Sequence, residues 1–123
     1  MDDARIWAFE ESLWKADAEH YRESIDDQCL MVVPHPPFVM EGAEAIESVT
    51  NTPRWTEVVF SDQRIARPQQ GIIVVAYDIK ATRDDVEPYE AHCTSTYRWL
   101  AHDEWRVVQH QQTPKLAVSQ SGH

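Results

Sequence analysis

The chain has 123 residues, enough for one domain with a buried core, and 42% of them are hydrophobic. Its 21 acidic and 11 basic side chains give a net charge of −10, which argues against binding to nucleic acid or to an anionic membrane, because both attract excess Lys and Arg. No apolar run approaches the roughly 20 residues needed to span a bilayer, and the acidic start lacks the basic-then-apolar order of a signal peptide, so we expect a cytoplasmic protein.

The start of the chain has apolar residues at helical spacing, which predicts an amphipathic helix with a wide apolar face. The stripe consists of Ile6, Phe9, Leu13 and Ala16, with Trp7 and Trp14 beside it. Asp2 or Asp3 can cap this helix at its first turn. Asp17 is placed to cap a second, short helix over residues 18–24, followed by an inward-facing Ile25.

Short apolar runs then predict a series of strands. In chain order we expect a turn at Asp26 and Asp27, a buried strand over 29–33, a loop over 34–37, a strand over 38–40, a short helix over 43–49 and a strand over 55–66. Neither alternation of the last strand gives a fully apolar inner face, so we expect a bulge there. Cys29 and Cys93 both lie in apolar runs, which indicates two buried free thiols rather than a metal site.

Residues 89–114 predict a β-hairpin, because Thr, Tyr, Trp and Val dominate them. The turn is either His102-Asp103 or a four-residue loop with the same pairing. The expected pairs are Ala101 with Glu104, Trp99 with Arg106, Tyr97 with Val108, Ser95 with His110, and Cys93 with Gln112. Tyr97, Trp99, Val108 and His110 then share a core face, while Thr94, Thr96, Arg98, Gln109 and Gln111, together with Leu100, Trp105 and Val107, form the outer face.

A strand over 72–83 precedes this hairpin. We place it so that Tyr77 meets Ser95, Val75 meets Tyr97, and Ile79 meets Cys93. A slip of one residue would bring Asp78 and Lys80 onto the apolar face, which is costly if that face is buried. The register therefore predicts a row of polar side chains on the core face, consisting of Tyr77, Ser95 and His110.

Two stretches carry a resemblance to a known family: DDQCLMVVPHPPFVMEGAEAI and YEAHCTSTYRWLAHDEWRVVQHQQTP. Their marks are the run 42–46 after a short strand and the ending 105–108 with 110–114. The chain resembles the SnoaL-like domains of the nuclear transport factor 2-like superfamily, and is most similar to its small bacterial domains of unknown function. The resemblance covers nearly the whole chain and implies one domain over 1–123. The residues after Pro114 are mostly polar, so we expect 115–123 to be a flexible tail.

That resemblance implies an α+β, cone-shaped, cystatin-like fold, in which a strongly curved mixed or antiparallel sheet wraps around the long first helix. It also implies a pocket at the open end. Isomerases of this fold use an acidic base near the end of an early strand, and this chain has Pro34-His35 in the comparable stretch. The superfamily contains isomerases, dehydratases, cyclases and proteins that only bind or associate, so the fold alone does not give the function.

Candidate site residues come from the core face. His110 can move a proton near neutral pH, and Tyr77 can donate to a developing oxyanion, which makes these two the catalytic candidates. The alternative is a buried network that only satisfies its own members. No inward Asp or Glu is evident to orient the imidazole. The expected ligand-binding residues are Trp14, Phe38, Trp55, Tyr77, Ser95, Tyr97 and His110, although each aromatic could also be plain core.

His35 lies in a Pro-bounded loop that could cover the pocket. His35 and His110 lack an obvious third ligand, so we expect no metal and no cofactor.

We expect a pocket for a small apolar carbonyl or ring compound, used for binding or for proton transfer of the isomerase, cyclase or dehydratase kind. The alternative is a non-catalytic ligand-binding module or a homodimeric association module. For either function we expect a homodimer through the convex outer face of the sheet. An Arg98 that reaches Glu90 or Asp78 of the partner would support such a dimer.

Overall fold

The computed structural model describes residues 1–116, and the predicted tail over 115–123 lies outside these residues except for its first two. The elements in chain order are α1 (Asp3–Lys15), α2 (Ala18–Ser24), β1 (Ile25–Val32), β2 (Val39–Glu41), α3 (Gly42–Thr50), β3 (Glu57–Gln69), β4 (Ile72–Thr82), β5 (Tyr89–Ala101) and β6 (Glu104–Pro114). No helix in this part of the chain is both long and apolar enough to cross a membrane.

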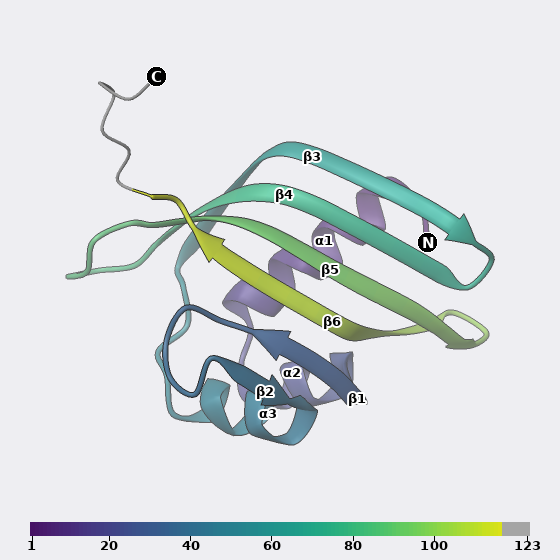
Figure 1. Cartoon of the computed structure of the whole chain (residues 1–123), viewed down its shortest axis with the longest axis horizontal. Helices are drawn as coiled ribbons and strands as arrows, with labels where there is room; N and C mark the ends of the chain where they lie inside the picture. Colours follow the sequence, from purple (N-terminus) through teal and green to yellow (C-terminus); the bar gives the residue numbers. More distant parts are fainter. Residues whose placement is uncertain (117–123) are drawn as a thin grey trace.

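The strands form one open sheet in the order β2-β1-β6-β5-β4-β3. β1 runs parallel to β6, and the other neighbours are antiparallel, so the sheet is mixed. The long strands curve around α1, while α2 and α3 close the side near β1 and β2 (Figure 1). This arrangement is the predicted α+β cone.

Helix α1 begins where Asp2 accepts a hydrogen bond from the Arg5 N–H at 2.9 Å, as an N-cap residue does. Its buried face differs from the predicted stripe, because the helix is rotated relative to it. The fully covered residues are Ile6, Glu10, Leu13 and Trp14. A carboxylate thus lies in the middle of the face that packs against the sheet.

The register between β4 and β5 was predicted wrongly by two residues. Tyr77 lies opposite Cys93, and Ser95 lies opposite Val75. Because side chains alternate with a period of two, this shift leaves every residue on its predicted face. The core face predicted for β4 is therefore present even though the pairs are different.

The predicted pairing of β5 with β6 is correct for Cys93 with Gln112, Ser95 with His110, and Ala101 with Glu104, and it is wrong for Tyr97 and Trp99. Irregularities after Thr96 and after Trp99 place Tyr97 opposite Val107. Val107 is fully buried, whereas the prediction gave that place to Val108. Such a bulge re-aims the following side chains.

Two tryptophans near the turn lie differently from their predicted places. Trp105 is half-buried and packs against the core, and Trp99 is 46% exposed instead of buried. Arg98 donates from Nε to Oδ2 of Asp26 of its own chain at 2.7 Å.

Asp26 and Asp27 form the start of β1 and not a turn. Asp26 is buried, and it accepts hydrogen bonds from the Gln28 N–H and from Arg98. Gly42 lies against this segment: a Cβ on Gly42 would come within 2.6 Å of the Asp26 carbonyl oxygen. The bulge predicted for β3 is present, since its pairing with β4 shifts after Ser61 and again after Ala66.

Candidate functional site

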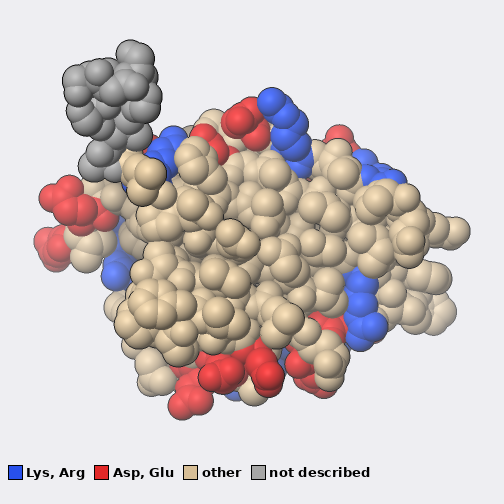
Figure 2. Space-filling model, viewed as in Figure 1, with Lys and Arg blue, Asp and Glu red and all other residues tan. Residues whose placement is uncertain are grey.

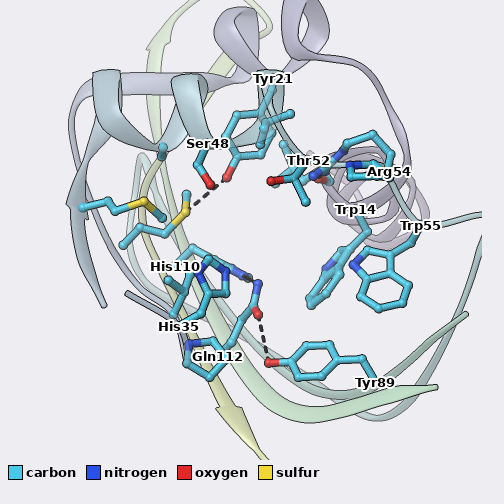
Figure 3. Close-up of a pocket in the computed structure, with 18 of the residues that line it drawn as sticks. Trp14, Tyr21, His35, Ser48, Thr52, Arg54, Trp55, Tyr89, His110 and Gln112 are labelled. Atoms are coloured by element: carbon cyan, nitrogen blue, oxygen red, sulfur yellow. Dashed lines mark hydrogen bonds between the residues drawn. The ribbon is translucent and has the colours of Figure 1, made fainter. Parts of the chain in front are cut away.

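A cavity of about 500 Å³ opens between the concave side of the sheet, the end of α1, and helices α2 and α3. Most of its wall is apolar or aromatic, with residues that include Leu13, Trp14, Tyr21, Ile25, Met31, Val33, Met40, Trp55, Tyr89 and Val107. The polar residues that line it include His35, Ser48, Thr52, Arg54, His110 and Gln112 (Figure 3). Arg83 and Glu87 line it as well. Ligand pockets are typically apolar with a few such polar groups.

His110 on β6 is held through both of its ring nitrogens. Its Nδ1 lies 2.7 Å from the Ser95 hydroxyl, and its Nε2 lies 3.2 Å from the Gln112 side-chain nitrogen. Gln112 in turn accepts a hydrogen bond from the Tyr89 hydroxyl at 3.0 Å. Trp14 packs edge-on against the imidazole, with ring centroids 5.9 Å apart.

Behind His110, fully buried, lies Glu10 of α1. Its carboxylate accepts hydrogen bonds from the hydroxyls of Tyr77 at 2.5 Å, Ser95 at 2.6 Å, and Tyr97. Trp14 donates its indole N–H to the Tyr77 oxygen at 3.1 Å. Three donors satisfy a buried charge that would otherwise be costly.

These contacts define the proton positions around His110. The single hydroxyl proton of Ser95 goes to Glu10, so the Nδ1 of His110 must donate to the Ser95 oxygen. The lone pair of Nε2 then points toward Gln112 and the cavity. Burial lowers the pKa of His110, and it outweighs the nearby Glu10 carboxylate and a backbone hydrogen bond with Thr94, which act in the opposite direction. The imidazole is therefore a neutral base near pH 7.

The predicted site residues separate into three groups. Trp14, Trp55 and His110 line the cavity. Tyr77, Ser95 and Tyr97 point to the same concave side but lie behind its wall, where they hold Glu10. Phe38 is half exposed in the loop before β2 and does not line the cavity. His35, from the same loop, does line it.

Glu10 was missed, and the statement that no inward carboxylate is available to His110 was wrong. Its Oε2 lies 3.7 Å from the His110 Nδ1. A signal was present in the sequence: Glu10 follows Ile6 by four residues and precedes Leu13 by three, so it lies on the same helical face.

Two arginines also border the cavity, and neither has a carboxylate partner among residues 1–116. Arg54 donates from Nε to the Ala16 carbonyl at 2.8 Å and from Nη2 to the Leu13 carbonyl, and its guanidinium lies over the Tyr21 ring. Arg83 donates to the Pro53 carbonyl at 2.5 Å and lies 4.7 Å above the Trp55 ring.

Neither cysteine takes part in the site. Cys29 and Cys93 are free and buried, and burial raises the pKa of each thiol to about 12, which leaves them unreactive. Within residues 1–116 no three His, Cys, Asp or Glu side chains are arranged to hold a metal ion.

A curved mixed sheet that wraps around a helix, with a cavity at its open end, is the architecture of the cone-shaped α+β folds. The sequence matches no protein-family model and no curated protein. Solved structures do match. A proposed ketosteroid isomerase from Parabacteroides distasonis is 19% identical with a TM-score of 0.76, covering 91% of this chain and 86% of its own.

Two further structures show the range of proteins with this architecture. An NTF2-like protein from Cytophaga hutchinsonii is 18% identical with a TM-score of 0.74, covering 94% of this chain and 100% of its own. The association domain of C. elegans CaMKII is 14% identical with a TM-score of 0.72, covering 89% and 91%. The chain has the nuclear transport factor 2-like fold, as its resemblance implied.

Proposed function

We propose that the protein binds a small apolar ring or carbonyl compound in its cavity and exchanges a proton with it through His110. The observation that carries this proposal is the chain of hydrogen bonds from the cavity wall to a buried carboxylate, through His110, Ser95 and Glu10. The volume of about 500 Å³ suits a compound of one to three rings.

The geometry supports a base that works by its Nε2 atom. A ligand C–H or O–H that replaces the Gln112 contact would meet the Nε2 lone pair. When Nε2 takes the proton, the imidazolium keeps its Nδ1–H on Ser95, and its positive charge lies next to Glu10. Glu10 is a positioning residue in this scheme, because it fixes the tautomer through Ser95 and does not touch the ligand.

Hydrogen exchange at the carbon next to a carbonyl tests this function directly. With 2-tetralone in D2O, followed by NMR, we expect the protein to accelerate the loss of the α-proton signal. His110→Asn should lower that acceleration by about a hundredfold or more, the usual share of a general base. Ser95→Ala should lower it less and shift its pH profile.

The matched control for this test is His92→Asn, since His92 is exposed and pairs with Asp78 on the outer face. Equal acceleration by the His110→Asn and His92→Asn variants would remove His110 from the chemistry. Absence of both binding and exchange with the wild-type protein would leave the association role described next.

A second candidate function, association through the outer face of the sheet, has its own supporting observation. Two rows of mostly uncharged side chains run across this face, and each ends in one charged residue, Glu41 on β2 for the first row and Arg64 on β3 for the second. One contains Leu30, Gln109, Thr96, Val74 and Ala66, and the other contains Val39, Val32, Gln111, Thr94 and Ala76. Charged pairs flank the rows, with Asp78 and His92 on one side and Arg98 and Arg106 on the other. An uncharged centre with a charged rim is typical of an interface, and it supports a homodimer through this face.

A further inference from the structure

The basic side chains of this protein differ in how their charge is balanced. Seven of the nine outside the cavity form ion pairs with Asp or Glu: Arg5, Lys15, Arg64, Arg67, Arg98, Arg106 and Lys115. Arg54 and Arg83, which line the cavity, form none within the described residues. In a chain with 21 acidic side chains, acids are not scarce, yet none of the described ones pairs with either cavity arginine.

Both arginines are nevertheless held firmly by neutral groups. Each donates to backbone carbonyls and lies over an aromatic ring of the wall, Tyr21 for Arg54 and Trp55 for Arg83. The two are tied to one segment, because Arg83 donates to Pro53, the neighbour of Arg54. A guanidinium has five N–H donors, so each keeps several for another acceptor.

Water only partly solvates the charges of these two guanidinium groups. Both are half-buried, and burial lowers the pKa of Arg54 because it disfavours the cation. Glu87 is the one acidic residue of the cavity wall; it is exposed and forms no ion pair with either arginine. A partly desolvated cation without a counter-ion is costly, and a bound anion would relieve that cost.

We propose that the cavity takes an apolar ring compound that carries a carboxylate, with the carboxylate held by Arg54 and Arg83 at the mouth. This inference rests on the proposed function, since it names the class of ligand for the same cavity. Trp55 contacts both the arginines' end and the aromatic part of the cavity. The Arg83 guanidinium lies over its ring, and the Tyr89 ring stacks with it, with centroids 5.9 Å apart and an interplanar angle of 14°. The ring of the ligand would pack against Trp14 and Trp55, with the polar end of the wall at His110 beyond it.

A pair of probes that differ only in charge tests the inference. Calorimetric titration with 2-naphthoate and with 2-naphthamide compares a carboxylate with its neutral isostere. We expect 2-naphthoate to bind at least about tenfold more tightly, the value of one charge-assisted hydrogen bond. Raising the salt concentration should weaken the binding of 2-naphthoate and leave the affinity for 2-naphthamide nearly unchanged.

The variant Arg83→Gln removes the charge and keeps a donor for Pro53. We expect this variant to bind 2-naphthoate about tenfold or more weakly and to bind 2-naphthamide with unchanged affinity. Arg64→Gln is the matched control, because Arg64 is an exposed arginine on β3 outside the main cavity, and it should change neither affinity. Arg54→Lys provides a second test that keeps the charge but loses the forked donors.

The outcomes separate the two proposals. If the amide binds as tightly as the carboxylate, the cavity is a binding site but the charge inference is wrong. If Arg83→Gln and Arg64→Gln weaken 2-naphthoate equally, only the overall charge of the protein matters, and the assignment to the mouth is wrong. If neither probe binds to the folded wild-type protein, the proposed pocket function fails together with this inference.

Discussion

His110 is both closely packed and in contact with a cavity. It is 6% exposed, yet it lines the cavity wall. Its neighbours on the buried side are a hydroxyl and a carboxylate, and its neighbours on the cavity side are an amide and aromatic rings. A neutral base that is held in one tautomer is the result of this environment.

The pKa of His110 makes a prediction about stability. Unfolding returns the imidazole to its ordinary pKa of 6.5, whereas the folded pKa is lower. The unfolded state therefore binds more protons between these values, and the free energy of unfolding should fall as the pH drops below 6.5, by at most about 1.4 kcal/mol per pH unit from this group. Denaturant titrations of wild type and His110→Asn between pH 7 and 5 measure the difference. A parallel pH dependence in both proteins would show that His110 does not contribute.

At the scale of elements, Gly42 fixes how α3 meets β1. A methyl group at this position would lie 2.6 Å from the Asp26 carbonyl oxygen and 3.3 Å from that of Asp27. Backbone cannot yield as a flexible side chain does, so Gly42→Ala should destabilise the fold by about 1–3 kcal/mol. Chemical denaturation measures it. Ala43→Gly on the exposed side of the same helix is the control, and a Gly42→Ala variant as stable as wild type would show that α3 can move away from β1.

The same elements show what the sequence can predict. Alternation along 72–83 and 89–97 correctly indicated which side chains face the core, because a shift by one residue would bury charged side chains, but it failed at Trp99, which is exposed. It did not determine the pairing of β4 with β5, since a shift by two residues preserves the faces. The alternation also could not predict the bulges that bury Val107 in place of Val108, because either valine suits an apolar site.

The candidate site was predictable in part for a related reason. Ser95 and His110 pair as expected, because the hairpin register brings them together from a nearby turn. Glu10 joins them from the other end of the chain, and no local pattern links it to β5. The polar row on the core face indicated a buried network, and an acid inside an apolar helical stripe was the available sign that a carboxylate joins it.

For the molecule as a whole, the distribution of charge sets one face of the sheet apart. Figure 2 shows the side on which Figure 1 draws the strands in front of α1, and its centre carries few charged side chains while Asp, Glu, Lys and Arg gather at the edges. Leu30, Val32 and Val39 are 55%, 39% and 61% exposed on this side. The face is therefore apolar near β1 and β2 and rich in Thr and Gln on β5 and β6.

A homodimer through this face would cover those apolar side chains and oppose the Thr and Gln rows of two copies. Replacing Leu30 and Val32 together by Glu should then shift the mass measured by light scattering from twice 14.3 kDa to 14.3 kDa at micromolar concentration, because two like charges would meet their symmetry mates. Val59→Glu is the control, since Val59 is 63% exposed on β3 at the opposite edge of the sheet. Both substituted residues are exposed, so the folded monomer should keep its unfolding temperature apart from the loss of association. A wild-type protein of 14.3 kDa would contradict the dimer itself. A double variant that stays dimeric would move the interface to another surface.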